Sequence, residues 1–244
     1  HRAEVNGELT KNSYDGITKN YIASVEITGS LVTSIGFSCF NGCHGLTEIT
    51  IPDSVTSFGV YAFYNCLGLT EFTIPDSVTN IGNHAFAECH YLSSVNIGNS
   101  VQTIGAYAFR KCVKLESVTI PDSVTTMGTQ AFKSCWTMTS VIIGNSVDKI
   151  DSFTFSEGYN LTSLIIGNSV GEIKDGAFWS CYNLTEITIP NSVTIIKNNT
   201  FHLCNNLATI YMSDTTRSNL GIDSFGVQSY KGSPTTTVIV QQNI

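Results

Sequence analysis

The sequence predicts a solenoid of the α/β class, built from about eight to nine stacked coils of 23 residues each. Phenylalanine recurs at an unbroken spacing of 23 residues from Phe40 to Phe201, and leucine, isoleucine and cysteine columns keep the same period. Within each repeat, apolar residues first alternate and then recur at spacings of three and four. A fixed period of this length is typical of solenoids, in which one unit cannot bury its apolar side alone and stacks on its neighbours.

A short strand is the first element expected in each repeat. In the unit 69–91, Phe72 and Ile74 flank polar Thr73, which is the period of a half-buried strand. Pro75 ends the strand because proline has no amide donor, and glycine takes this place in other repeats. Successive strands are expected to form a parallel sheet on the concave face of a curved stack.

A short helix or 3₁₀ segment is the second element expected. Val78, Ile81, Ala85, Phe86 and Cys89 are spaced by three and four residues, which would place them on one side of a tight helical turn. The bulkier helical segments would lie opposite the strands and curve the stack.

The regular pattern covers residues 22–225, and both ends depart from it. Residues 1–21 are polar and weakly patterned, and we interpret them as an N-terminal cap or leader. Residues 226–244 are interpreted as a C-terminal cap, in which the alternating run 235–241 forms a terminal strand over the sheet edge. Three late repeats carry Asp151, Lys174 and Lys197 in place of a repeated glycine, so their coils are expected to pack less regularly.

Composition argues against nucleic acid and membrane insertion. Only 13% of residues are charged and the net charge is −7, which opposes a phosphate-binding surface. No apolar run approaches the ~20 residues that span a bilayer, and residues 1–10 lack the pattern of a signal peptide. A surface rich in serine, threonine and asparagine suits an extracellular or cell-surface location.

Seven of the eight cysteines share one repeat column, from Cys43 to Cys204. Neighbouring coils lie ~4.8 Å apart, which is within reach of a disulfide, but parallel Cβ directions suit its dihedral angle poorly. We interpret the column as buried thiols that act as small hydrophobic side chains, with one or more bridges as the alternative.

No constellation of catalytic, cofactor-binding or metal-binding residues is found. The cluster of Cys39, Cys43 and His44 has zinc-like spacing, yet Cys43 belongs to the core column. An Asp and Asn column after the strand, which includes Asp122 and Asn145, is expected to hydrogen-bond the turn backbone, with calcium as the alternative. The chain is therefore predicted not to be an enzyme.

The repeat pattern L-x-x-V/I-x-I-P-x-S-V-x-x-I-G-x-x-A-F-x-x-C resembles the BspA-type leucine-rich repeat, and residues 115–135 are a close match. The resemblance implies a right-handed leucine-rich-repeat horseshoe. It also implies a surface or secreted protein of a host-associated microbe or protist, linked to adhesion and protein binding. The family supplies no catalytic residues.

One strand column offers a candidate protein-binding site. Its background is threonine, but two adjacent coils carry isoleucine. The β propensity of branched side chains is one explanation, and a contact patch is the other. The candidate residues are Ile142, Ile165, Thr188 and Tyr211.

A second candidate is an aromatic stripe at the bend before the strand. Trp136, Tyr159 and Tyr182 occupy one column in successive coils, near Trp179 in the sequence. Aromatic ladders often only stabilise stacking, and the alternative is a stripe that contacts a protein or sugar rings. Glycosylation sequons begin at three asparagines, which are Asn160, Asn183 and Asn198.

The leading hypothesis is a non-enzymatic protein-binding or adhesion module that uses its extended concave face. The partner would be a protein, such as a host matrix or cell-surface protein. The alternatives are a carbohydrate-binding surface and a structural spacer of a larger surface protein.

Overall fold

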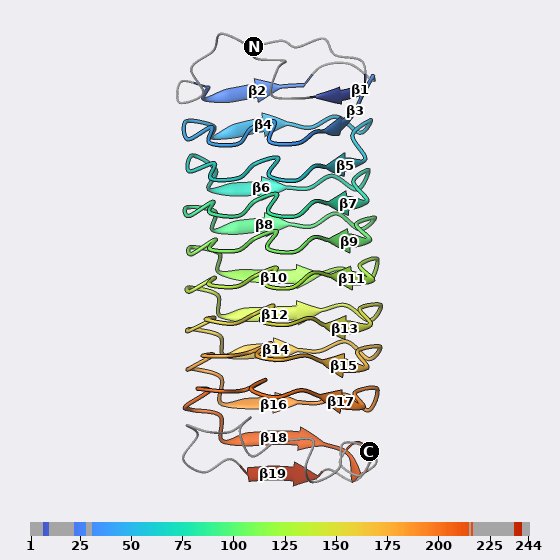
Figure 1. Ribbon diagram of the computed structural model, residues 1–244, viewed down its shortest axis with the longest axis vertical. Coiled ribbons are helices and arrows are strands. Elements are labelled where there is room, and N and C mark those ends of the chain that lie inside the picture. The colour runs from blue at the N-terminus through green and yellow to red at the C-terminus, as the bar shows by residue number, and fades with distance from the viewer. Residues whose placement is uncertain (1–6, 10–21, 28–30, 215, 217–236, 241–244) are drawn as a thin grey trace.

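The chain forms a parallel β-solenoid whose coils stack along the long axis of the molecule (Figure 1). The computed structural model describes residues 7–9, 22–27, 31–214, 216 and 237–240. Each regular coil contributes two short strands, one to each of two stacks that run side by side along the solenoid. All of the strand pairs are parallel, and most join residues one repeat apart.

The first stack is the sheet expected from the sequence. Its hydrogen-bonded groups are β2–β4, β6–β8, β10–β12–β14 and β16–β18–β19. The bounds of its strands are β2 Ser24–Glu26, β4 Glu48–Thr50, β6 Glu71–Thr73, β8 Ser94–Asn96, β10 Ser117–Ile120, β12 Ser140–Ile143, β14 Ser163–Ile165, β16 Glu186–Thr188, β18 Thr209–Met212 and β19 Thr237–Val240.

The second stack replaces the first half of the expected helical segment. Six of its strands form one sheet in the order β1–β3–β5–β7–β9–β11, and the other three follow as β13–β15–β17. The bounds are β1 Gly7–Leu9, β3 Val32–Ile35, β5 Ser57–Phe58, β7 Asn80–Ile81, β9 Thr103–Ile104, β11 Thr126–Met127, β13 Lys149–Ile150, β15 Glu172–Ile173 and β17 Ile195–Ile196.

The prediction of a helical segment is therefore wrong, and the hydrogen bonds explain why. We call the segment around each repeated phenylalanine, residues 82–91 in one coil, the arc. The N–H groups of His84, Phe86 and Glu88 donate to carbonyls of the next coil at 2.7–2.9 Å. The N–H groups between them close tight turns within the coil. An α-helix would need every one of these donors for its own i−4 carbonyls, so coil-to-coil bonding excludes it.

Left-handed backbone makes this alternation possible. Two arc positions in each coil have φ between +53° and +73°, one two residues before the phenylalanine and one two residues after it. Fourteen of the residues in these two columns are not glycine, and the other two are Gly42 and Gly176. Non-glycine residues pay a steric cost in this conformation, so the coil-to-coil bonds hold the arc in a shape that local propensity opposes.

The core is a set of parallel columns, as the sequence predicts. The phenylalanine rings stack nearly parallel, with centroids 5.1 Å apart from Phe86 to Phe109 and from Phe109 to Phe132. The cysteine column lies beside them and is fully buried. The thiols of Cys89 and Cys112 donate to the carbonyls of Phe63 and Phe86, at 3.1 and 3.3 Å. The buried-thiol interpretation is thereby confirmed.

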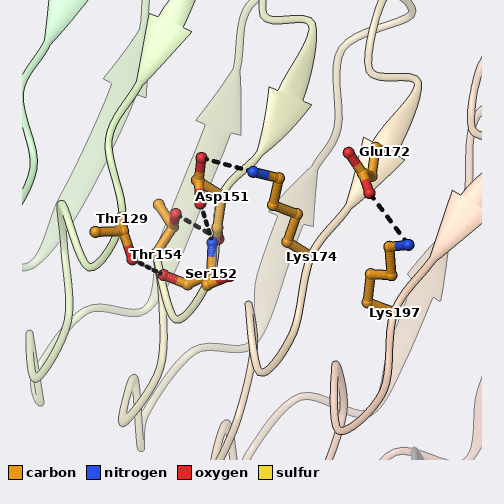
Figure 2. A network of polar contacts seen from close by, with 7 residues as sticks. All are labelled: Thr129, Asp151, Ser152, Thr154, Glu172, Lys174 and Lys197. Atoms are coloured by element: carbon orange, nitrogen blue, oxygen red, sulfur yellow. Dashed lines mark hydrogen bonds and ion pairs between the residues drawn. The ribbon is translucent and has the colours of Figure 1, made fainter.

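The coils that lack the repeated glycine differ as expected. Ring spacing in the phenylalanine column widens to 5.8 Å between Phe155 and Phe178. The side chains that replace the glycine join a polar network along the second stack (Figure 2), in which Lys174 Nζ lies 3.1 Å from Asp151 Oδ2. Lys197 Nζ lies 3.7 Å from Glu172 in the same way. These ion pairs link neighbouring coils in addition to the backbone hydrogen bonds, which keep their usual lengths at Lys174 and Lys197.

Candidate protein-binding face

The outward side chains of the first stack, together with the turn after each strand, form a broad surface that we call the strand face. Ile142 and Ile165 lie opposite one another in the paired strands β12 and β14. They are 39% and 56% exposed, whereas Val141 and Ile143 beside Ile142 are buried. The β-strand alternation thus places two adjacent aliphatic side chains in solvent.

The other two predicted residues occupy the same column farther along. Thr188 and Tyr211 are opposite one another in β16 and β18. Thr188 is exposed, while Tyr211 is half-buried and its hydroxyl donates to Glu186 Oε2 at 3.5 Å. Strand β14 and strand β16 belong to different hydrogen-bonded groups, so the column falls into two pairs.

A groove of about 570 Å³ runs beside the Ile142–Ile165 pair. Its far side is the turn after each strand, where Gly144 and Gly167 replace the proline of other coils. A Cβ at Gly144 would lie 2.7 Å from the Pro121 carbonyl oxygen, so the backbones approach too closely for a side chain here. Gly144 and Gly167 thus line the groove with backbone alone, opposite the two isoleucines.

The Asp and Asn column supports the outer edge of the groove. Asp122 Oδ1 accepts a hydrogen bond from the Asn145 N–H at 2.6 Å, and Asn145 Oδ1 accepts one from the Asn168 N–H at 3.0 Å. The predicted bonding to turn backbone is confirmed, and it runs from coil to coil. Among the described residues, no group of three or more His, Cys, Asp or Glu side chains is placed to hold a metal ion.

The aromatic stripe forms a ladder at the bend before the strands. The ring centroids of Trp136 and Tyr159 are 6.2 Å apart, and those of Tyr159 and Tyr182 are 5.0 Å apart. Both faces of the Tyr159 ring are therefore directed at its neighbours. Trp179 lies against other rings, namely Phe153 and His202, at 6.0 and 4.4 Å.

The first two sequons are exposed and lie in one ladder beside the aromatic stripe. Asn183 Nδ2 donates to Asn160 Oδ1 at 3.2 Å, and Asn160 Nδ2 donates to the Trp136 carbonyl at 2.9 Å. Asn198 is exposed in the coil that follows β17. The amide groups of the first two asparagines are thus already engaged in coil-to-coil bonds.

A second aromatic row was missed by the sequence analysis. Tyr61, His84 and Tyr107 stack along the arc with centroids 4.7 and 4.6 Å apart. Burial, followed by the nearby Arg110 charge, lowers the pKa of His84, so a neutral imidazole is favoured in the stack. The 23-residue spacing of these three residues is visible in the sequence and could have revealed the row.

Burial also controls the cysteine chemistry. It raises the pKa of Cys89 to about 12, and it raises the pKa of Cys112 as well. The thiolate is the reactive form of cysteine, so these thiols are poor nucleophiles in the folded protein. They serve the core rather than a reactive site.

Within the described ranges, no helix has the length and apolar character needed to cross a bilayer. The observed features, two stacks of parallel strands around columns of repeated apolar residues, define a solenoid of the leucine-rich-repeat class. The chain belongs to the family described as BspA type leucine rich repeat region, whose model matches residues 10–139 and 126–244 and occurs in 6 copies. No match was found among curated proteins.

Two crystal structures of bacterial proteins share this fold. A leucine rich repeat protein of T. pallidum is 31% identical, with a TM-score of 0.63 over 66% of this chain and 78% of that protein. A leucine rich cell surface protein of Faecalibacterium prausnitzii A2-165 is also 31% identical, with a TM-score of 0.53 over 80% of this chain. The match spans 61% of the Faecalibacterium protein, so that relative extends well beyond the matched part.

Proposed function

We propose that the chain is a non-enzymatic protein-binding or adhesion module of a secreted or cell-surface protein, and that it binds through the strand face. The observation that carries this proposal is the Ile142–Ile165 pair, which is exposed beside an open groove on the three-stranded sheet β10–β12–β14. An exposed aliphatic pair beside a concavity offers apolar area that a partner can remove from water. The cell-surface location named for the Faecalibacterium relative supports the same assignment.

The rigidity of the sheet supports this use. Strand β12, which carries Ile142, pairs with β10 on one side and with β14 on the other, and β14 carries Ile165. A partner can therefore contact several coils without ordering a loop, which lowers the entropic cost of binding.

A carbohydrate-binding surface is the second candidate function. Trp136 and Tyr182, at the two ends of the aromatic stripe, are 44% and 37% exposed. Their outer faces are open to a sugar ring, but the ring between them is covered on both sides by its neighbours. The ladder geometry therefore accounts for the stripe as a stacking element, and the strand face is favoured.

The test is a double substitution, Ile142→Thr with Ile165→Thr. Threonine occupies the same column at Thr119 and Thr188, so the strands should be retained. The variant should lose at least about tenfold in affinity for a protein partner found in a panel of purified matrix proteins, because exposed aliphatic anchors carry much of an interface energy. A matched control is Ile195→Thr, which removes an exposed isoleucine, 43% exposed, from the second stack.

A glycan array and a Trp136→Leu, Tyr182→Leu variant separate the two candidates. If the aromatic variant loses binding while the isoleucine variant retains it, the binding site is the aromatic stripe. A structural spacer would bind neither the protein panel nor the array.

A further inference from the structure

Charge is segregated between the faces of the solenoid. The described part of the first stack and its turns carries exposed carboxylates in most coils, and no lysine or arginine. The described basic residues lie on the arcs, the bends and the second stack. Lys114, for example, lies in the bend before β10. When the residue directly before each strand is counted with the strand face, its carboxylates are Glu26, Glu48, Asp53, Glu71, Asp76, Glu116, Asp122, Glu186 and Asp214.

Ion pairing does not neutralise this face. The ion pairs formed among the described residues lie on the arcs and the second stack, where carboxylates meet lysines or His90 at 2.8–3.7 Å. None involves a strand-face carboxylate. Glu48 and Glu71 moreover occupy the same column in successive coils, as do Asp53 and Asp76. Like charges gathered on one face repel each other, so this arrangement lowers the stability of the unbound protein.

The same face is hollowed in two adjoining places. The groove beside Ile142 and Ile165 includes Asp122 in its lining, and a second recess of about 260 Å³ over β4, β6 and β8 is lined by Glu48 and Glu71. Buried Phe72 lies in the lining of that recess. The two hollows share Asn96 and are therefore neighbours on the face. Each hollow combines carboxylates with apolar side chains.

We infer that the strand face takes a polypeptide segment rich in lysine or arginine and in aliphatic residues. Long basic side chains can lay their apolar stems on Phe72 or on the isoleucine pair and keep their charged ends at the carboxylates. Such a partner relieves the repulsion between stacked carboxylates, which a neutral or acidic partner cannot do. This inference rests on the proposed function and specifies its partner class.

The probe is a fluorescent dodecapeptide of lysine and serine with two central leucines, measured by anisotropy at low salt. Two companion peptides carry glutamate for each lysine, or serine for each leucine. The basic leucine-containing peptide should bind at least about tenfold more tightly than the acidic one. Its affinity should fall at least about tenfold between 50 and 500 mM NaCl, since exposed charge pairs are screened by salt.

Matched charge variants locate the effect. Glu116→Gln with Asp122→Asn should weaken binding of the basic peptide about fivefold or more, and asparagine can keep the turn bond of Asp122 because Asn145 makes the same bond. The control, Asp148→Asn with Asp175→Asn, removes two exposed carboxylates outside the strand face and should change affinity less than about twofold. Equal effects in both variants, equal affinity for the basic and acidic peptides, or no binding of the basic peptide overturns the inference.

The isoleucine variant separates this inference from the proposed function. If binding of a protein from the matrix-protein panel requires Ile142 and Ile165, but the basic and acidic peptides bind equally well, only the inferred partner class is wrong. If neither binding of the panel proteins nor binding of the basic peptide is weakened by the isoleucine variant, the proposed function through the isoleucine pair is refuted.

Discussion

The left-handed arc residues lead to a substitution that should stabilise the protein even though it removes a side chain. Gln130 has φ +55° and is one of the fourteen non-glycine residues in this conformation. Removing the steric strain of the left-handed backbone should add about 1–2 kcal/mol to the free energy of unfolding. The larger conformational entropy of glycine in the unfolded state should lower that free energy by about 0.5–1 kcal/mol. We therefore expect Gln130→Gly to raise the free energy of unfolding by about 0–1.5 kcal/mol. The natural glycines Gly42 and Gly176 already occupy this kind of position.

Gln102→Gly is the matched control, because Gln102 is exposed and is not among the residues with positive φ. It should lower stability by about 0.5–1 kcal/mol, the ordinary cost of glycine in ordered backbone. Urea titration followed by circular dichroism measures both variants, and thermal melting checks the ranking. Solenoid coils can unfold stepwise, so the midpoints of matched variants are compared rather than absolute free energies. If Gln130→Gly is as destabilising as Gln102→Gly, the strain argument is refuted.

Three further predictions concern the core columns. Phe109→Ala should cost about 3–5 kcal/mol, since the ring is fully buried between two stacked neighbours, and a negligible shift in the urea midpoint would contradict the column model. The thiols should resist a thiol reagent at pH 8 until the chain is denatured, because at a pKa of about 12 only about one Cys89 side chain in ten thousand is ionised. The raised pKa is a folded-state property, so its stabilising contribution is complete below the ordinary thiol pKa of 9.0 and is lost as pH rises towards 12. Melting temperatures measured across that range should fall, and a flat profile would argue against the burial of ionisable thiols.

The sequence was sufficient for the core and the first stack. Phe72, Cys89 and Leu92 are fixed by a period that no insertion interrupts, and each is buried as the columns require. The exposure of Ile142 and Ile165 also follows directly from β alternation. These features depend only on which residues repeat and on the geometry of extended chain.

The arc could not be predicted in the same way. Spacings of three and four suit a helix, but they equally suit a chain that turns tightly and bonds to its neighbours. The choice depends on the N–H groups of residues such as Phe86, which bond to the next coil and not to their own. That competition is non-local, and left-handed φ at His84 and Glu88 contradicts their local preference. Charge segregation was also missed, because it appears only when the two stacks are seen as separate faces.

The coil-to-coil hydrogen bonds allow the number of coils, and so the length of the solenoid, to change. Alternate arc N–H groups donate to carbonyls one coil onward, and strand pairs such as Val118 with Val141 join residues 23 apart. Removing or duplicating whole units returns the same donors to the same acceptors, whereas a change by part of a unit shifts the register of the coils on either side of it. Each added unit lengthens the strand face by ~4.8 Å while its shape and bonding stay constant. The reach of the surface can therefore change through duplication of coding units alone, independently of the residues that choose the partner.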